Sequence, residues 1–135
     1  MKQIKFSLSS NEKQILETLW RENKSLTRSQ LIDLTHNKTW EKGSIHVLLN
    51  QLLNKNAIEV DNIIKTGKSY GRTYKPTLTK EQYELMQLSN VFKEINPSKA
   101  SLKNFFSALV ESEVLEDNTL EELENLIKQH KRDCK

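Results

Sequence analysis

The chain has 135 residues, of which 36% are hydrophobic and 29% charged, and its formal net charge is +3. This length suits one domain with a modest core, or a small domain with an appendage. Three glycines and two prolines argue against a many-turned β architecture, and one cysteine excludes an intrachain disulfide framework. No apolar run approaches the ~20 residues that a membrane-spanning helix needs, so membrane insertion is not expected.

Two helices are predicted before residue 40. Ser9 with Glu12, and Thr27 with Gln30, have the spacing of capping boxes, which open helices. The first helix has one apolar face and closes near residues 23–25. The second is short and ends near residues 36–37. Their predicted buried positions are Ile15, Leu16, Leu19, Trp20, Leu31 and Leu34.

A third helix is predicted over residues 39–54. Ile45, Leu48, Leu49 and Leu52 recur at i, i+3, i+4 and i+7 and form one buried stripe. The opposite face has no acidic residue and combines amide side chains with one valine. Such a face suits contact with base edges, although a solvated polar face is the alternative. The candidates for base contact are Ser44, His46, Val47 and Asn50, with Gln51 nearer the edge.

A β-hairpin is predicted after the third helix. Residues 57–60 and 63–65 have strand composition, residues 66–68 form a turn, and residues 69–75 form the return strand before Pro76. Three helices followed by a hairpin form the winged helix-turn-helix arrangement, in which the hairpin, or wing, lies along the DNA backbone. We expect Tyr70 and Tyr74 to pack within the wing.

Cations near the helix starts and the wing tip are candidates for phosphate contact. The three wing cations cluster at a turn, which favours a functional role. For the two cations near helix starts, simple solvation is equally compatible with the sequence. Trp20 and Trp40 are both expected in the core. The phosphate candidates are Arg28, Lys42, Lys65, Lys68 and Arg72.

The remaining residues predict three more amphipathic helices. Thr79 with Gln82 forms a third capping box, opening a helix that stops before Pro97. Ser98 caps the next helix, and Thr119 with Glu122 predicts the start of the last. One small chain offers little else against which to bury their apolar stripes, so we expect a two-fold dimer rather than packing back onto the N-terminal part. The expected dimerisation residues are Leu102, Phe105, Phe106, Leu109, Leu120, Leu123 and Ile127.

The distribution of charge also divides the chain into two parts, before and after residue 78. Residues 1–78 hold 13 Lys and Arg against 7 Asp and Glu, whereas residues 79–135 hold 8 against 11. A basic first part suits a polyanion, and an acidic second part does not. We therefore predict a DNA-binding winged-helix domain over residues 1–78 and a helical dimerisation region over residues 79–135. Residues 1–6 lack the apolar stretch of a signal peptide, and a cytoplasmic location is expected.

Neither a catalytic arrangement nor a cofactor site emerges from the sequence. No glycine-rich phosphate loop or nucleophile elbow is present, so an enzyme is not expected. His130 and Cys134 are spaced i, i+4, but two ligands without a third form a weak metal signal. A frayed polar terminus explains this pair better, and we predict no metal and no cofactor.

The chain resembles the penicillinase-repressor family (BlaI/MecI/CopY type) of winged-helix transcriptional regulators. The resemblance rests on residues 8–20, on Trp40, on residues 45–58 and on the tail over residues 109–127. It implies a dimeric repressor that binds an inverted-repeat operator in double-stranded DNA. For the β-lactam-responsive members it also implies a membrane sensor protease as partner.

Three departures from the family pattern stand out. Residues 41–47 replace a threonine-rich run, and Gln51 stands where a basic residue is common. The Asn-Phe bond that is cleaved in the β-lactam-responsive members aligns with Ala108-Leu109, and the nearby Asn104-Phe105 pair is not equivalent. Copper-responsive members carry paired cysteines, whereas this chain has only Cys134. A sequence-specific repressor is therefore the leading hypothesis, and a winged-helix protein-interaction module without DNA binding is the alternative, because His46 is the only potential cation on the third helix's outer face.

Overall fold

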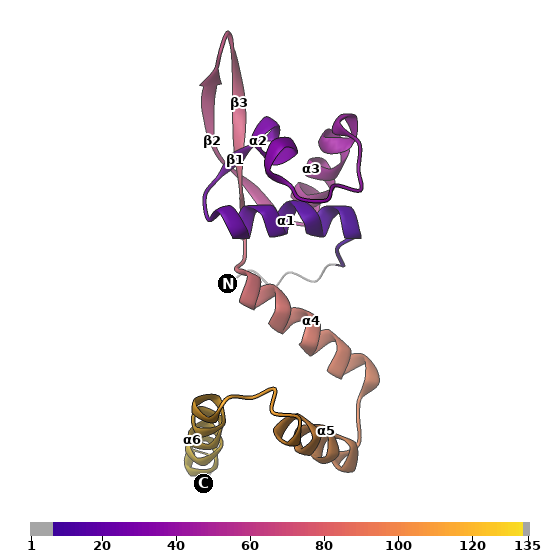
Figure 1. Ribbon diagram of the computed structural model, residues 1–135, viewed down its shortest axis with the longest axis vertical. Helices are drawn as coiled ribbons and strands as arrows, with labels where there is room; N and C mark the ends of the chain where they lie inside the picture. The colour runs from indigo at the N-terminus through magenta and orange to yellow at the C-terminus, as the bar shows by residue number, and fades with distance from the viewer. Residues whose placement is uncertain (1–6, 134–135) are drawn as a thin grey trace. The chain divides into compact units, whose positions relative to one another are not determined.

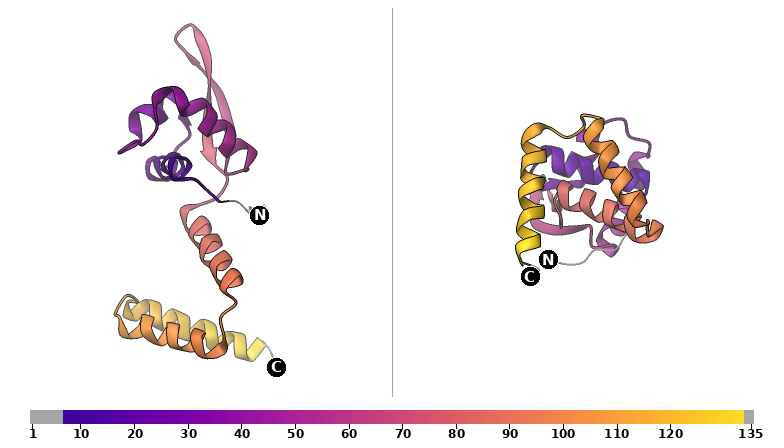
Figure 2. Two further views of the ribbon diagram at one scale, coloured as in Figure 1. Left: turned by 90° about the vertical axis from the view of Figure 1, so that its right-hand side faces the viewer. Right: turned by 90° about the horizontal axis from the view of Figure 1, so that it is seen from below.

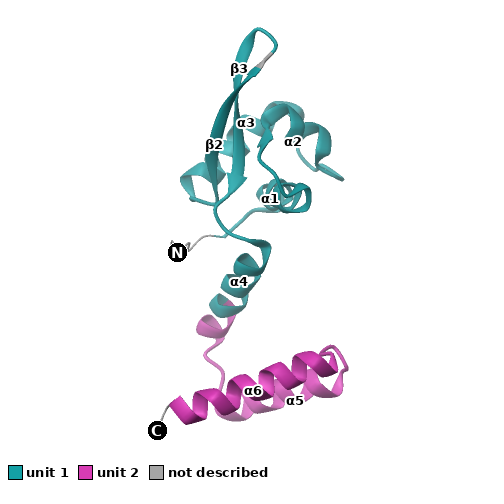
Figure 3. Ribbon diagram, turned by 90° about the vertical axis from the view of Figure 1, so that its left-hand side faces the viewer, with its two compact units in different colours: residues 1–90 teal, residues 91–135 magenta. Residues whose placement is uncertain are grey.

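The computed structural model describes residues 7–133, apart from the side chain of Thr66. It divides into two compact units, residues 1–90 and 91–135 (Figure 3). Residues 1–6, where no signal peptide is expected, and Cys134 lie outside the described residues. The two units divide within helix α4 (Lys80–Ile95). The predicted boundary between residues 78 and 79 separates a DNA-binding region from a dimerisation region, and this division by function stays a prediction.

Helix α1 (Ser10–Glu22) begins at the predicted capping box. The Ser9 hydroxyl accepts from the Glu12 amide at 3.2 Å, and the Glu12 carboxylate accepts from the Ser9 amide at 2.8 Å. The helix closes at Asn23, whose φ of 54° is left-handed and turns the chain out of the helix. Both predicted ends of α1 are therefore confirmed.

Helix α2 (Arg28–Leu34) begins at the second capping box, and both reciprocal hydrogen bonds of Thr27 and Gln30 are present. It ends at Leu34, earlier than predicted, because Thr35 is extended. The two residues before it, Leu26–Thr27, form a short strand, β1, that the sequence did not predict.

The third helix is shorter than the predicted span of residues 39–54. A 3-10 turn, η1 (Lys42–Ser44), leads into α3 (Ile45–Asn54), and residues 39–41 are not helical. The predicted stripe of Ile45, Leu48, Leu49 and Leu52 is buried, with at most 6% of any of these residues exposed. The periodicity therefore predicted the buried face correctly but not the helix start.

Strands β2 (Ile58–Thr66) and β3 (Ser69–Pro76) form the predicted antiparallel hairpin, which extends past α2 and α3 (Figure 1). Gly67, at a φ of 66°, occupies the turn, where a left-handed backbone suits glycine. The register shifts between Val60 and Asn62, which indicates a bulge. β1 pairs with the other side of β3, giving the strand order β1-β3-β2.

A single hydrophobic cluster joins the three helices to the base of the hairpin. Trp40 is buried in it, as expected, and Trp20 packs against it while partly buried. Tyr74, which was expected to pack within the wing, is buried in this cluster instead. Tyr70 does not pack within the wing: 74% of it is exposed, because its strand position lies beyond the reach of the helices. The fully buried aliphatic members of the cluster are Ile15, Leu16, Leu26, Leu31, Leu52 and Ala57.

Helix α4 begins at the third predicted capping box, where Thr79 and Gln82 exchange hydrogen bonds of 2.9 and 3.0 Å. It ends at Ile95, before Pro97, as predicted. Helices α5 (Lys99–Glu111) and α6 (Asp117–Asp133) follow, joined by a loop (Figure 2).

One predicted helix start is wrong. α6 begins at Asp117, so Thr119 lies in its first turn instead of capping it. The carbonyl of Glu116 accepts the hydrogen bond from the Leu120 amide at 3.0 Å, which starts the helix earlier. The architecture as a whole is mainly α with a small antiparallel sheet, a winged helix-turn-helix followed by helices, as predicted. Nowhere in residues 7–133 is a helix both long and apolar enough to cross a membrane.

Candidate nucleic-acid interface

The outer face of α3 presents the predicted base-contacting residues to solvent. His46, Val47, Asn50 and Gln51 are exposed, Val47 by 57%, whereas Ser44 is half-buried. Within residues 7–133, no hydrogen bond or ion pair holds the side chains of Asn50 and Gln51. Their amide groups are therefore free to donate to and accept from a ligand, which is what bidentate contact with adenine requires.

Arg28, at the start of α2, contacts His46 on α3. Its Nη1 lies 2.6 Å from Nε2 and 3.3 Å from Nδ1 of the imidazole. A guanidinium has donors only, so the ring nitrogen that faces it must accept. The structure thus joins a predicted phosphate contact to a predicted base contact, a pairing that periodicity within one helix does not reveal.

The wing carries its predicted cations on its outer half. Lys65, Lys68 and Arg72 are all exposed, and in the described part of the chain none of them forms an ion pair. Lys42, the first residue of η1, is also exposed and unpaired within that part. These four cations can therefore each approach a phosphate without breaking an existing interaction.

Charges at the base of the wing are paired among themselves. The Lys75 ammonium lies 3.2 Å from Asp61 and 3.5 Å from Glu59, and the Ser25 hydroxyl donates to Asp61 at 2.5 Å. The hydrogen bonds from Ser25 and Lys75 lower the pKa of Asp61, and Asp61 in turn raises the pKa of Lys75. The acidic residues of the wing are thus engaged at its base, away from the cations at its tip.

A lysine directly after α3 fixes that helix to α1. The Lys55 ammonium donates to the Glu12 carboxylate and to the Ser7 carbonyl, each at 2.7 Å. Burial of the Glu12 carboxyl acts to raise its pKa, but the hydrogen bonds from Lys55 and Ser9 outweigh burial, and the pKa lies below its ordinary value of 4.5. This pair of a buried carboxylate and a half-buried ammonium, which sequence reasoning missed, holds the C-terminal end of α3 in place.

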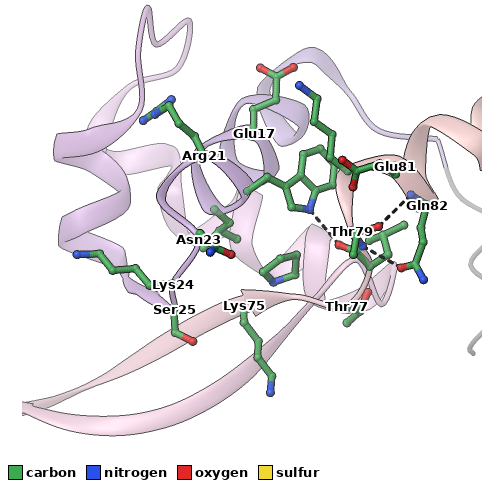
Figure 4. Close-up of a pocket in the computed structure, with 15 residues that line it drawn as sticks. Glu17, Arg21, Asn23, Lys24, Ser25, Lys75, Thr77, Thr79, Glu81 and Gln82 are labelled. Carbon is green, nitrogen blue, oxygen red and sulfur yellow. Dashed lines mark hydrogen bonds between the residues drawn. The ribbon is translucent and has the colours of Figure 1, made fainter. Parts of the chain in front are cut away.

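A cavity of about 980 Å³ is lined by the end of α1, the end of β3 and the start of α4 (Figure 4). The Trp20 indole donates to the Leu78 carbonyl at 2.9 Å inside it, and its ring lies 5.6 Å from that of Tyr83. The lining residues have both signs of charge, and none of the predicted DNA contacts is among them. The cavity is therefore bordered by the winged helix on one side and by the start of α4 on the other, and it is separate from the candidate interface.

The expected dimerisation residues remain uncovered in a single chain. Phe105, Phe106, Leu123 and Ile127 are exposed by 39–58%, and Leu102, Leu109 and Leu120 are only partly buried. Phe105 contacts both Phe92 and Phe106, with ring centroids 5.9 and 5.8 Å apart. Sequence reasoning missed two further exposed leucines on α4, Leu85 and Leu88, although their 63% and 57% exposure fits the same pattern.

Groups that could hold a metal ion were expected to be absent. In the part of the chain that the structure describes, no three His, Cys, Asp or Glu residues gather in a suitable cluster. Cys134, the second half of the weak sequence signal, lies outside that part.

Residues 8–129 match the penicillinase repressor family. The matched residues include both the winged helix and the C-terminal helices. The chain belongs to this family. It is therefore a DNA-binding transcriptional repressor and not an enzyme, which confirms the leading hypothesis from the sequence. No individual curated protein matches the chain. A helix-turn-helix places its second helix in the major groove, so the outer face of α3 is the candidate surface for base contact.

Proposed function

We propose that this repressor acts as a homodimer on an inverted-repeat operator. Each protomer inserts α3 (Ile45–Asn54) into the major groove of one half-site, and the wing cations contact the adjacent phosphates. The observation that carries the proposal is the exposed α3 face, on which the amides of Asn50 and Gln51 lie one turn after the apolar Val47 without any acidic neighbour.

The base contacts in this proposal come from Ser44, His46, Val47, Asn50 and Gln51. Asn50 and Gln51 suit the donor and acceptor pair of adenine, and Val47 suits the methyl group of thymine. The phosphate contacts come from Lys42 and from the wing. Arg28 differs from the other cations, because its contact with His46 makes it a residue that positions a base contact.

Dimerisation through α5 and α6 is supported by the exposure of their apolar residues in a single chain. None of the residues in these two helices is buried in a single chain, although both carry apolar stripes. Exposed apolar surface of this kind marks a protein interface. A two-fold dimer covers it and presents two α3 helices to the two halves of a palindrome.

A cytoplasmic location follows from the proposed DNA partner. The resemblance implies a membrane sensor protease as partner only for the family's β-lactam-responsive members, and we do not propose one for this chain. Ala108-Leu109 stands at the position of their cleaved Asn-Phe bond, and both residues belong to α5.

Selection of duplexes from a random pool by the purified full chain, at near-physiological salt, tests the proposal. We expect recovery of an inverted repeat whose half-sites lie about 10 base pairs or a multiple of that apart, centre to centre. Recovery of no sequence above background would contradict base contact by α3 and favour a protein-interaction role for the winged helix. Recovery of one unrepeated half-site would contradict the dimer.

A further inference from the structure

The connection from β3 to α4 is short, and hydrogen bonds tie it to the winged helix. The Thr77 amide donates to the Ala57 carbonyl at 3.0 Å, and the Thr77 hydroxyl donates to the Asn56 carbonyl at 2.6 Å. Both carbonyls lie just beyond the end of α3. Thr79 then caps α4 through Gln82 (Figure 4). The start of α4 is therefore linked to the end of the helix that is proposed to enter the major groove.

Trp20 of α1 braces the same connection from the other side. Its indole donates to the Leu78 carbonyl at 2.9 Å, and its ring lies 5.6 Å from the ring of Tyr83. Tyr83 is only 7% exposed, and the Gln87 side chain forms a hydrogen bond with it. The cavity of about 980 Å³ lies beside this contact, so truncating either ring enlarges an existing space. The start of α4 would then be held mainly by the backbone links at Thr77.

Helix α4 presents different residues on its two sides. Tyr83 is buried, whereas Leu85 and Leu88 are 63% and 57% exposed. Consecutive residues of an α-helix are about 100° apart, so Leu85 and Leu88 point about 200° and about 140° away from Tyr83. One side of α4 thus packs on the winged helix. The other side adds its leucines to the apolar surface that the proposed dimer covers.

A braced helix between the winged helix and the dimer surface limits the operators that a dimer can bind. Two α3 helices on one duplex need a defined separation, and one added base pair moves a half-site by about 3.4 Å and turns it by about 35° around the duplex. A loose connection would let each winged helix follow that displacement, whereas a braced connection opposes it. The contact that braces α4 therefore affects which half-site separations are bound.

We propose that the Trp20–Tyr83 contact sets the half-site spacing that this repressor accepts. Both are positioning residues, which act through the direction of α4 and do not touch DNA. The outer face of α3 selects the sequence of each half-site, and the contact between the two rings selects the distance between the half-sites. This inference rests on the proposed function, and it adds a determinant of operator choice that lies away from the base contacts.

Operators that keep both half-sites and vary only the spacer test the inference. The parent chain is titrated with the selected operator, with spacers lengthened or shortened by one or two base pairs, and with a duplex that holds a single half-site. We expect the affinity of the parent chain to fall by about tenfold or more when the spacer changes by one base pair. Equal affinity for all spacers would overturn the inference.

Variants assign the spacing preference to the two rings. Trp20→Ala and Tyr83→Ala should bind the best spacing about tenfold more weakly and should lose most of the penalty for the other spacers, because the second half-site gains less from the first. Their affinity for the single half-site should equal that of the parent chain. Tyr83→Phe keeps the ring and should keep the preference. Ile15→Val, in the core of α1 and outside the cavity lining, is the control for a general loss of stability.

Trp20→Phe provides a milder test. It keeps a ring but loses the hydrogen bond to the Leu78 carbonyl, so its spacing preference should lie between those of the parent chain and Trp20→Ala. If the alanine variants fail to fold and Trp20→Phe behaves like the parent chain, the two rings serve folding only and the inference is overturned.

The remaining outcomes separate the contact from other determinants. An unchanged spacing preference in both alanine variants would overturn the inference and assign the spacing to residues after α4. Sedimentation should show that Trp20→Ala remains dimeric, and a monomeric variant would overturn the inference by placing Trp20 in the dimer interface. An equal loss of preference in Ile15→Val would also overturn it. Failure of the parent chain to bind any inverted repeat would instead refute the proposed function.

Discussion

Nη1 of Arg28 lies 2.6 Å from Nε2 of His46, so the first residue of α2 holds a side chain on the outer face of α3. The two helices of the helix-turn-helix are thus linked at the surface as well as through the core. Removing a cation that contacts only phosphate lowers the affinity for all DNA sequences equally. Removing a residue that orients a base contact instead changes the sequence preference.

We therefore predict that Arg28→Ala relaxes preference at the same base pair as His46→Ala. Because one residue acts through the other, the double variant should lose about as much binding free energy as either single variant, instead of the sum. Competition binding with operator duplexes changed at single positions measures this. Additive losses, with preference unaltered in Arg28→Ala, would show that Arg28 contacts phosphate independently.

Asn50 and Lys68 should behave differently from each other. Asn50→Ala should cost about 1–3 kcal/mol on the operator and little on unrelated DNA, because a bidentate amide contact is lost. Lys68→Ala should lower the affinity for all DNA sequences to a similar extent. It should also reduce the slope of log affinity against log salt concentration by about one. Titrations at several salt concentrations separate these effects, and binding by both variants equal to the parent would refute the assignment.

The Glu12–Lys55 pair predicts acid-sensitive stability. The pKa of Glu12 is lowered in the folded chain, so its contribution is complete above the ordinary value of 4.5 and is lost as pH falls through the lowered pKa. Glu12→Gln should therefore cost about 1.5–3 kcal/mol at neutral pH, and the cost should shrink below pH 4.5. Glu17→Gln, which removes an exposed carboxylate of the same helix, is the control.

Urea denaturation at pH 7 and pH 3 provides the measurement for the Glu12 prediction. An equal loss for Glu12→Gln at both pH values would contradict a charged, hydrogen-bonded Glu12. A comparable loss in Glu17→Gln would show that the effect belongs to α1 charges in general.

Phe106 tests the dimer. It is 57% exposed on α5, and burying such a ring in an interface contributes about 2 kcal/mol per protomer. Phe106→Asp should shift sedimentation towards the monomer while helix content by circular dichroism is kept. Asn104→Asp introduces the same charge at an exposed position on the opposite side of the helix and should remain dimeric. A dimeric Phe106→Asp variant would place the interface elsewhere.

Local patterns in the sequence predicted most of the fold. The capping boxes at Ser9, Thr27 and Thr79 define helix starts through contacts three residues apart, and these starts are confirmed. The box at Thr119 failed, because α6 already begins at Asp117 and Thr119 lies in its first turn. Strand β1 has two residues and exists only through its pairing with β3, so no local pattern could reveal it.

The candidate interface shows the same limit. The exposure of Val47, Asn50 and Gln51 followed from helical periodicity. The Arg28–His46 contact and the Lys55–Glu12 pair, 18 and 43 residues apart in sequence, depend on how the helices cross, which periodicity does not specify. Assigning residues to the two faces of the hairpin required the strand register, including the bulge after Val60, and the sequence alone does not specify that register.

Stoichiometric titration of the selected operator tests the central claim most directly. A homodimer on an inverted repeat predicts two chains bound per duplex. It also predicts a steep loss of affinity, about 100-fold or more, when one half-site is scrambled, because specific contacts of several kcal/mol are lost. One chain per duplex, with equal affinity for the intact repeat and the scrambled half-site, would contradict the account.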